Sequence, residues 1–330
     1  MKGRIEHKQK SEQHMRQLLI DKPTFVLDFY EYLLVSKEYL TAKVYVKTVL
    51  RFIDFLEFSG KSINENNFQE LNVRNLNKFV LSMKGKKSEE STDSAKIQVI
   101  SALKSFAEYL VKVDIISKNP FLDIKQSNKD KPKQVYLDGD ELKSLIKKIE
   151  DNSAGSEIEK ARRKRWIKRN SAIFRILITT GIRVTALTEL NIEDFNPEER
   201  TIEVIDKRRT SFVKTLDETT AETIKEWIID RERILQGEHC DALFISNRKT
   251  RITSKAVGDL VTSYCTDFDK RITPHKFRSS FASNYYLGTK DIVGVQKLLG
   301  HQNIETTQRY TNGISVNSLE AANFMNDLLK

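Results

Sequence analysis

The chain has 330 residues, of which 39% are hydrophobic and 31% are charged. Its length suggests two domains, and its composition is that of a globular chain in which each half can bury a core. The formal net charge of +10 favours an acidic partner, with nucleic acid ahead of a membrane surface. No run approaches the ~18 apolar residues of a membrane span, and the first residues lack the apolar core of a secretory signal.

The two cysteines, Cys240 and Cys265, lie far apart in the sequence and match no metal-binding spacing. We interpret both as small packing residues in a chain that works in a reducing cytoplasm.

The N-terminal third is predicted to be helical. Apolar residues recur at helical spacing within 21–36, 41–60, 66–87 and 91–125. Thr41 is the expected cap of the second helix and Gly60 its stop, and Asn119 before proline ends helical structure. Residues 1–20 are polar and basic and fit either a leading helix or a disordered arm.

Several cations in these helices are candidate DNA contacts. Lys43, Lys47 and Arg51 follow one another at intervals of four residues, which places them on one helix face. The same face could simply be solvated, but the net positive charge favours phosphate contact. Lys96 and Lys104 are further candidates on the last of these helices.

Residues 125–136 are poor in apolar side chains and contain Pro132 and four lysines, which predicts an interdomain linker. These lysines suit either a path along DNA or a plain solubilising segment. Asp138 or Asp140 then caps the first helix of the second half.

The second half alternates helices with a short β region. The run KARRKRWIKR, at 160–169, is the densest positive stretch and fits an exposed helix face or a phosphate-facing one. The helix that follows should end at Gly181, so that Arg183 begins the next helix. Residues 201–217 alternate in hydrophobicity and predict a strand pair with a basic turn, and 243–246 predict another short strand.

Residues 273–312 contain most of the candidate catalytic residues. They carry His275, Arg278, His301 and Tyr310 in that order, between apolar residues at helical spacing. His275 and Arg278 are three residues apart and share a helix face. Gly300 follows VGVQKLL and predicts a helix ended by a left-handed glycine. An arginine, two histidines and a tyrosine near DNA suggest attack on a phosphodiester.

The motifs HKFR, LLGH and TTQRY resemble the C-terminal signature of the tyrosine recombinases, also called the phage integrase family. The spacing is H-x-x-R, then L-G-H, then a tyrosine nine residues after that histidine. The segment TTGIRVTALTELNIEDF, at 179–195, resembles the first arginine box of the family, which puts Arg183 in the same site. Residues 20–125 resemble, more weakly, the N-terminal domain of the family.

The resemblance implies a mainly α-helical fold in two domains. A helical core-binding domain that binds DNA would occupy residues 1–124, and a linker would follow at 125–136. Residues 137–330 would form an α-rich catalytic domain with a small antiparallel β-sheet. The two domains would close as a C-shaped clamp around duplex DNA.

The resemblance also implies site-specific recombination. Tyr310 would attack the scissile phosphorus and release a 5′-hydroxyl, and the phosphotyrosine ester would store the bond energy without ATP. Arg183 and Arg278 would bind the non-bridging oxygens through two-point contacts. We expect no metal ion, no cofactor and no small-molecule ligand.

The remaining roles fall to histidine and lysine. His275 would donate to phosphate or accept the tyrosine proton, and His301 would donate to a non-bridging oxygen. The leaving 5′-oxygen needs a proton, which Lys207 on the basic turn would supply. Lys207 lacks the flanking glycines that are frequent in the family, and Lys214 is the alternative.

A second departure from the family pattern is Ala186, which stands where an acidic residue usually follows the first arginine. This residue is the one feature that supports a catalytically dead DNA-binding module. A type IB topoisomerase is the other alternative, because it shares the chemistry without synapsis.

The last residues favour a recombinase over a topoisomerase, whereas trapping of a covalent protein–DNA complex would separate it from a dead module. The segment 317–330 is too apolar for a solvated tail, with Leu319, Phe324, Met325, Leu328 and Leu329. The family uses such tails to join subunits, so we expect a homotetramer on two double-stranded DNA sites.

Overall fold

The computed structural model describes residues 12–37, 39–64, 67–83, 93–124, 135–205 and 211–300. The chain divides into two compact units, residues 1–130 and 131–330. The division falls within the segment expected to be a linker, most of which, 125–134, lies outside the described residues. The DNA-binding and catalytic roles of the two units remain predictions.

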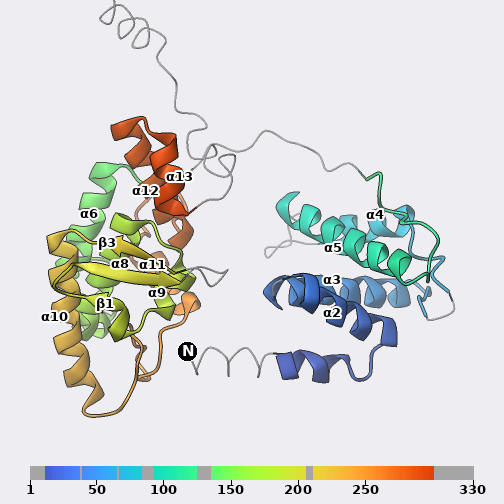
Figure 1. Ribbon diagram of the computed structural model, residues 1–330, viewed down its shortest axis with the longest axis horizontal. Coiled ribbons are helices and arrows are strands. Elements are labelled where there is room, and N and C mark those ends of the chain that lie inside the picture. Colours follow the sequence, from blue (N-terminus) through green and yellow to red (C-terminus); the bar gives the residue numbers. More distant parts are fainter. Residues whose placement is uncertain are drawn as a thin grey trace, which may run out of the picture. The chain divides into compact units, whose positions relative to one another are not determined.

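The first unit is a helical bundle (Figure 1). Residues 12–19 are helical, and the larger elements are α2 (Thr24–Ser36), α3 (Tyr39–Phe58), α4 (Val73–Ser82) and α5 (Asp93–Lys112). Helices α2, α3 and α5 pack against one another. Their aromatic rings meet in the core, where the ring centroids of Phe29 and Phe106 are 5.1 Å apart and edge-on.

Helix α3 begins at Tyr39, so the prediction that Thr41 caps it is wrong. The predicted stop is confirmed: the helix ends at Phe58, and Gly60 has a φ of +71°. The Lys61 amide then donates to the Leu56 carbonyl at 2.9 Å, which satisfies one of the last carbonyls of the helix.

The second unit combines helices with a three-stranded antiparallel sheet in the order β1–β2–β3 (Figure 1). The strands are β1 (Phe195–Asn196), β2 (Thr201–Ile205) and β3 (Ser211–Thr215). The helices are α6 (Gly139–Glu150), α7 (Glu157–Arg163), η1 (Lys164–Trp166), α8 (Ile167–Thr180), α9 (Val184–Glu189), η2 (Ile192–Asp194), α10 (Glu218–Leu235), α11 (Ser254–Tyr264), α12 (Pro274–Thr289) and α13 (Ile292–Leu299). The predicted mainly helical class with a small antiparallel sheet is confirmed.

Local signals account for two of these boundaries. Asp138, one of the two predicted caps, accepts hydrogen bonds from the Asp140 and Glu141 amides at the start of α6. Helix α8 ends at Gly181, which has a φ of +62°, as its sequence predicted.

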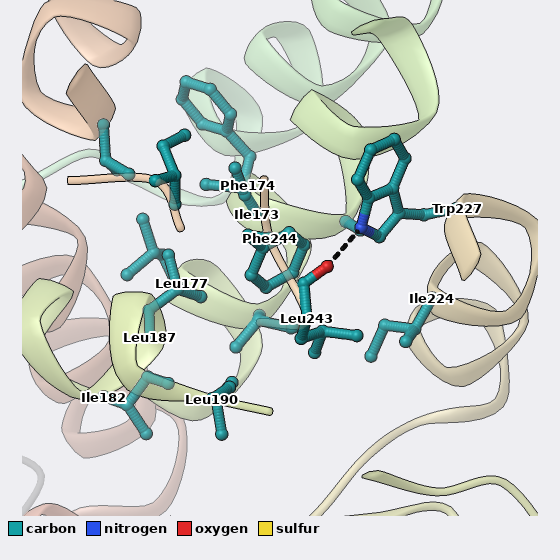
Figure 2. Packing of buried hydrophobic residues seen from close by; sticks show 14 of the residues in the cluster. Ile173, Phe174, Leu177, Ile182, Leu187, Leu190, Ile224, Trp227, Leu243 and Phe244 are labelled. Atoms are coloured by element: carbon teal, nitrogen blue, oxygen red, sulfur yellow. Dashed lines mark hydrogen bonds between the residues drawn. The ribbon is translucent and has the colours of Figure 1, made fainter. Parts of the chain in front are cut away.

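Helix α8 lies at the centre of the second unit and packs against α6, α10 and α12. Figure 2 shows Ile173 and Phe174 of α8 facing the segment that carries Leu243 and Phe244, with Trp227 of α10 beside it. The Trp227 Nε1–H donates to the Leu243 carbonyl at 2.8 Å, which satisfies a buried donor that would otherwise cost about 1–3 kcal/mol.

The strand predicted at 243–246 is wrong. Ile245 makes only an isolated bridge, with Arg251, and the neighbouring residues cross the core as irregular chain. Leu243, Phe244 and Ile245 are apolar because they are buried among helices. A short apolar run of this kind cannot be told from a buried strand by its sequence.

The interpretation of the cysteines as packing residues is confirmed. Cys265 is buried in the core of the second unit, and burial raises the pKa of its thiol to about 12. Cys240 is half-buried against the same core. No described helix combines the length and the apolar character needed to cross a membrane.

Candidate active site

A small hollow in the second unit brings together three cations that are distant in the sequence. Arg183 lies just before α9, Lys214 is on β3 and Arg278 is on α12. Its remaining lining residues are apolar and come from neighbouring elements: Ile182, Ala186, Val204, Phe212, Leu298 and Leu299. The described lining therefore contains positive charge and no carboxylate.

Gly181 positions Arg183. The positive φ at Gly181 turns the chain out of α8, and Arg183 follows as the residue that precedes α9 in extended conformation. A Cβ at position 181 would lie 2.6 Å from Cδ1 of Phe281 and 3.2 Å from Cδ2 of Leu299. Glycine is required here for both its backbone angle and its lack of a side chain.

Arg278 is buried, with 4% of its surface exposed. Its Nη1 donates to the Gly181 carbonyl at 2.8 Å and its Nη2 to the Leu299 carbonyl at 2.6 Å. These carbonyls end α8 and α13, where the helix dipole favours a cation. The guanidinium group thereby fixes two helix ends beside the hollow.

Lys214 is held in the same way. It lies opposite Ile202 in the sheet, and its Nζ donates to the Leu298 carbonyl. Burial, together with the charge of Arg278, lowers the pKa of its ammonium group. Lys214 and Arg278 thus hydrogen-bond to the carbonyls of the last two residues of α13. Gly300 follows as the C-cap of this helix, with a φ of +64°, as predicted.

His275 lies in the first turn of α12, one turn before Arg278. It is exposed, and its carbonyl accepts a hydrogen bond from the Ser279 hydroxyl at 3.3 Å. The lining of the hollow includes Arg278 but not His275. The three other predicted catalytic residues, Lys207, His301 and Tyr310, lie outside the described residues.

Ala186 occupies the expected acidic position and is 9% exposed in the wall of the hollow. Its methyl group supplies no acceptor to Arg183. Glu189 ends α9 and is half-buried, but it does not belong to the lining. The departure from the family pattern therefore places a methyl group, instead of a carboxylate, in this wall of the hollow.

Arg251 supports this site in a way that the sequence did not reveal. Its Nη1 donates to the carbonyls of Thr188 and Leu190, both at 3.0 Å, and its Nη2 donates to the Asn191 side chain. The three acceptors lie at the end of α9, about 60 residues earlier in the chain. No local pattern marks such a pairing, because it depends on the tertiary fold.

The predicted DNA contacts of the first unit differ in their surroundings. Lys47 and Arg51 are exposed on α3, whereas Lys43 is half-buried with its ammonium group 5.8 Å from the Tyr39 ring centroid. Lys104 donates to the carbonyls of Leu122 and Ile124 at 3.1 and 2.7 Å. Its ammonium group holds the turn after α5, which argues against a phosphate contact. Lys96 is half-buried on α5.

Neither unit offers a cluster of metal ligands among the described residues. The lining of the hollow brings guanidinium and ammonium donors together, a set of groups that suits anionic oxygens.

Known proteins resemble the chain across both units. At 27% identity over 295 residues, it is similar to the tyrosine recombinase XerC of Natranaerobius thermophilus, covering 87% of this chain and 93% of the relative. A XerC from Vibrio vulnificus is 28% identical over 236 residues and covers 71% of each chain.

Solved structures share the fold. The XerH recombinase bound to a palindromic difH substrate matches with a TM-score of 0.67 at 22% identity, over 87% of this chain and 80% of that one. A lambda integrase dimer bound to a core site matches with a TM-score of 0.63 at 16% identity, over 88% and 96%.

The family model of the phage integrase family matches residues 135–314, which is more than half of the chain. The match spans Arg183, Lys214 and Arg278 of the hollow and reaches beyond Tyr310. The chain therefore belongs to the phage integrase family.

Proposed function

We propose that this chain is a site-specific DNA recombinase that cleaves and rejoins DNA through a 3′-phosphotyrosyl intermediate. The observation that carries the proposal is the hollow in which Arg183, Lys214 and Arg278 meet. Its support from relatives is that XerC proteins are tyrosine recombinases and that XerH and lambda integrase bind DNA in structures of this fold.

In the proposed reaction, the Tyr310 hydroxyl loses its proton and attacks the scissile phosphorus. A P–O bond to tyrosine forms as the bond to the 5′-oxygen breaks, so one phosphodiester replaces another. Arg183 and Arg278 would stabilise the charge that grows on the non-bridging oxygens, where preorganised cations contribute most to catalysis. A buried, fixed guanidinium such as that of Arg278 needs little reorganisation at that moment.

His275 and His301 complete the proposed set. His275 would accept the tyrosine proton or donate to the phosphate, and His301 would donate to a non-bridging oxygen. His301 directly follows Gly300, whose helix is anchored by Arg278 and Lys214. The leaving 5′-oxygen would take its proton from Lys207, with Lys214 as the alternative donor.

The proposed partner is double-stranded DNA, bound by four copies of the chain that join two sites. Lys43, Lys47 and Arg51 of α3 would contact the duplex from the first unit. The apolar segment 317–330 would join neighbouring copies.

Tyr310→Phe tests the reaction. It removes the attacking oxygen and keeps the ring, so the variant should bind DNA as the wild type does and form no covalent protein–DNA complex. Trapping on a DNA carrying a nick near the cleavage site, followed by denaturing electrophoresis, measures the adduct.

The matched control replaces another tyrosine of the second unit, Tyr286→Phe, and should keep the covalent complex. An adduct in Tyr310→Phe would show that a different residue is the nucleophile. The absence of any adduct in the wild type on its own recombination site would overturn the proposed function.

A further inference from the structure

A second positively charged groove lies in the same unit, outside the hollow that holds Arg183. It runs between α7, the turn at 246–251 and the side of α11 that carries Ala256 and Leu260. With a free volume of about 650 Å³, it is far larger than a single side chain. Its lining contains five arginines and two acidic residues.

Both acidic residues of this groove already have partners. The Glu159 carboxylate accepts hydrogen bonds from the Ser156 amide at 2.8 Å and the Ser156 hydroxyl at 2.9 Å. These bonds, together with the charges of Arg163 and Arg162, lower the pKa of Glu159, so its carboxylate stays charged and offsets one of the five arginines. Asp259 pairs with Lys255 at 2.8 Å.

Two of the arginines donate hydrogen bonds that stabilise the fold, and these bonds do not neutralise their charge. Arg169 donates to the Ile245 carbonyl at 2.9 Å and to the Asn170 side chain, and Arg251 donates to the carbonyls that end α9. Their hydrogen-bond acceptors are uncharged, so both guanidinium groups retain their field in the groove. Burial lowers the pKa of Arg169 to about 10, which still leaves it charged at neutral pH.

Of the other three arginines, Arg162 and Arg248 supply exposed donors to the groove and Arg163 supplies charge. Arg162 and Arg248 are exposed, and among the residues that the structure describes their side chains form no ion pair or hydrogen bond. Arg163 is held by the Ala154 and Glu159 carbonyls, with its guanidinium carbon 4.4 Å from the Tyr264 ring centroid. Its Nη1 is buried and has no hydrogen-bond partner among the described residues, so Arg163 contributes its charge to the groove from a position fixed by the fold.

We propose that this groove, lined by Arg162, Arg163 and Arg248, binds backbone phosphates of the DNA outside the reacting phosphodiester. The proposal rests on the proposed function, because it takes the same duplex as its ligand. Phosphate oxygens match the forked donors of arginine, and a groove with this charge attracts a polyanion at long range. The groove also gives a role to the run at 160–169, part of which is buried at Trp166 and Arg169.

The test is the double variant Arg162→Gln and Arg248→Gln in the full chain. Each lost phosphate contact reduces the slope of log affinity against log salt by about 0.9, so the double variant should lose about 1.8. The control double variant, Lys143→Gln and Arg233→Gln, removes the same formal charge from exposed sites on α6 and α10 that do not line the groove. It should leave the slope near that of the wild type.

Neutral methylphosphonate linkages, placed one at a time along the duplex, locate the contact. Substitution at the contacted phosphates should weaken binding of the wild type and of the control, but not of the groove variant. Two results would overturn the proposal. One is an equal salt slope in the groove variant and its control, and the other is that every methylphosphonate weakens binding of the groove variant as much as it weakens binding of the wild type.

Single-turnover cleavage separates this proposal from the reaction itself. At saturating DNA, the groove variant should form the Tyr310 adduct at the wild-type rate, because the groove and the hollow share no lining residue. A failure of the proposed function would instead show as a wild type without an adduct, whatever the salt slopes. A reduced maximal rate in the groove variant would contradict a purely binding role.

Discussion

Lys207 and Lys214 carry the two candidate ammonium groups for protonating the leaving 5′-oxygen. Lys207 lies on the predicted basic turn, outside the described residues. Lys214 lines the hollow with Arg183 and Arg278, but its Nζ already donates to the Leu298 carbonyl. We therefore expect Lys214 to fix the end of α13 and Lys207 to serve as the acid.

A substrate with sulfur at the 5′-bridging position distinguishes these roles. An alkoxide leaving group needs a proton in the transition state, whereas a thiolate is far less basic, as the ~8.5 pKa of a cysteine thiol indicates. Lys207→Ala should slow cleavage of normal DNA by about 10²–10⁴-fold and cleave the sulfur substrate at nearly the wild-type rate.

Lys214→Ala should be slow on both substrates, because a displaced α13 is not repaired by a better leaving group. Rapid single-turnover sampling measures all four rates. Rescue of Lys214→Ala by sulfur, without rescue of Lys207→Ala, would reverse the assignment. In that case the lowered pKa of Lys214 predicts a cleavage rate that falls, as pH rises, at a pH below the ordinary lysine value of 10.5, because only the protonated amine is an acid.

Single residues also show which parts of the site the sequence could supply. Gly181 and Gly300 were predictable, since a helix ended by a left-handed glycine is a local signal. The hydrogen bonds from Lys214 and Arg278 to the end of α13 were not predictable, because they join residues 84 and 21 positions apart. The environment of Ala186 likewise depends on which strands face α9.

At the scale of one element, α3 presents the proposed DNA-binding face of the first unit. Replacing Lys43, Lys47 and Arg51 with alanine should lower the salt slope of DNA binding by about 0.9 for each phosphate contact that is lost. Exposed Lys47 and Arg51 should account for most of the change, because Lys43 lies half-buried beside Tyr39.

Lys104→Ala is the matched comparison on α5. Its ammonium group holds the Leu122 and Ile124 carbonyls, so its loss should lower the free energy of unfolding by about 1 kcal/mol and leave the salt slope unchanged. Fluorescence anisotropy over a salt series and chemical denaturation provide the two measurements. A triple α3 variant with the wild-type slope would show that this face is only solvated.

Elements were predictable where one periodicity dominates. Helices α2, α4, α8 and α13 follow from apolar residues at helical spacing, and the pair β2–β3 follows from alternation. The apolar run at 243–246 misled the prediction, because burial between helices and burial in a sheet select the same residues. Helix α10 escaped prediction although its Asp217 cap is an ordinary start signal.

At the scale of the assembly, the segment 317–330 is predicted to join copies of the chain. It lies outside the described residues, but its sequence places Phe324 and Leu328 four residues apart, on one face if it is helical. Leaving such side chains exposed is costly, and a neighbouring subunit in a closed ring can cover them. Each copy would then donate one tail and receive another.

Deletion of residues 317–330 should therefore spare binding to a single DNA site while weakening synapsis and recombination. The point variant Phe324→Ser with Leu328→Ser should reproduce the loss, and the control Asn323→Ser with Asn326→Ser should not, because asparagine contributes little to an apolar interface. Gel shift on one site, sizing of the two-site complex and a recombination assay report the three steps separately. Normal recombination by the truncated chain would exclude the tail as the link between subunits, and a loss of single-site binding would place it within one copy.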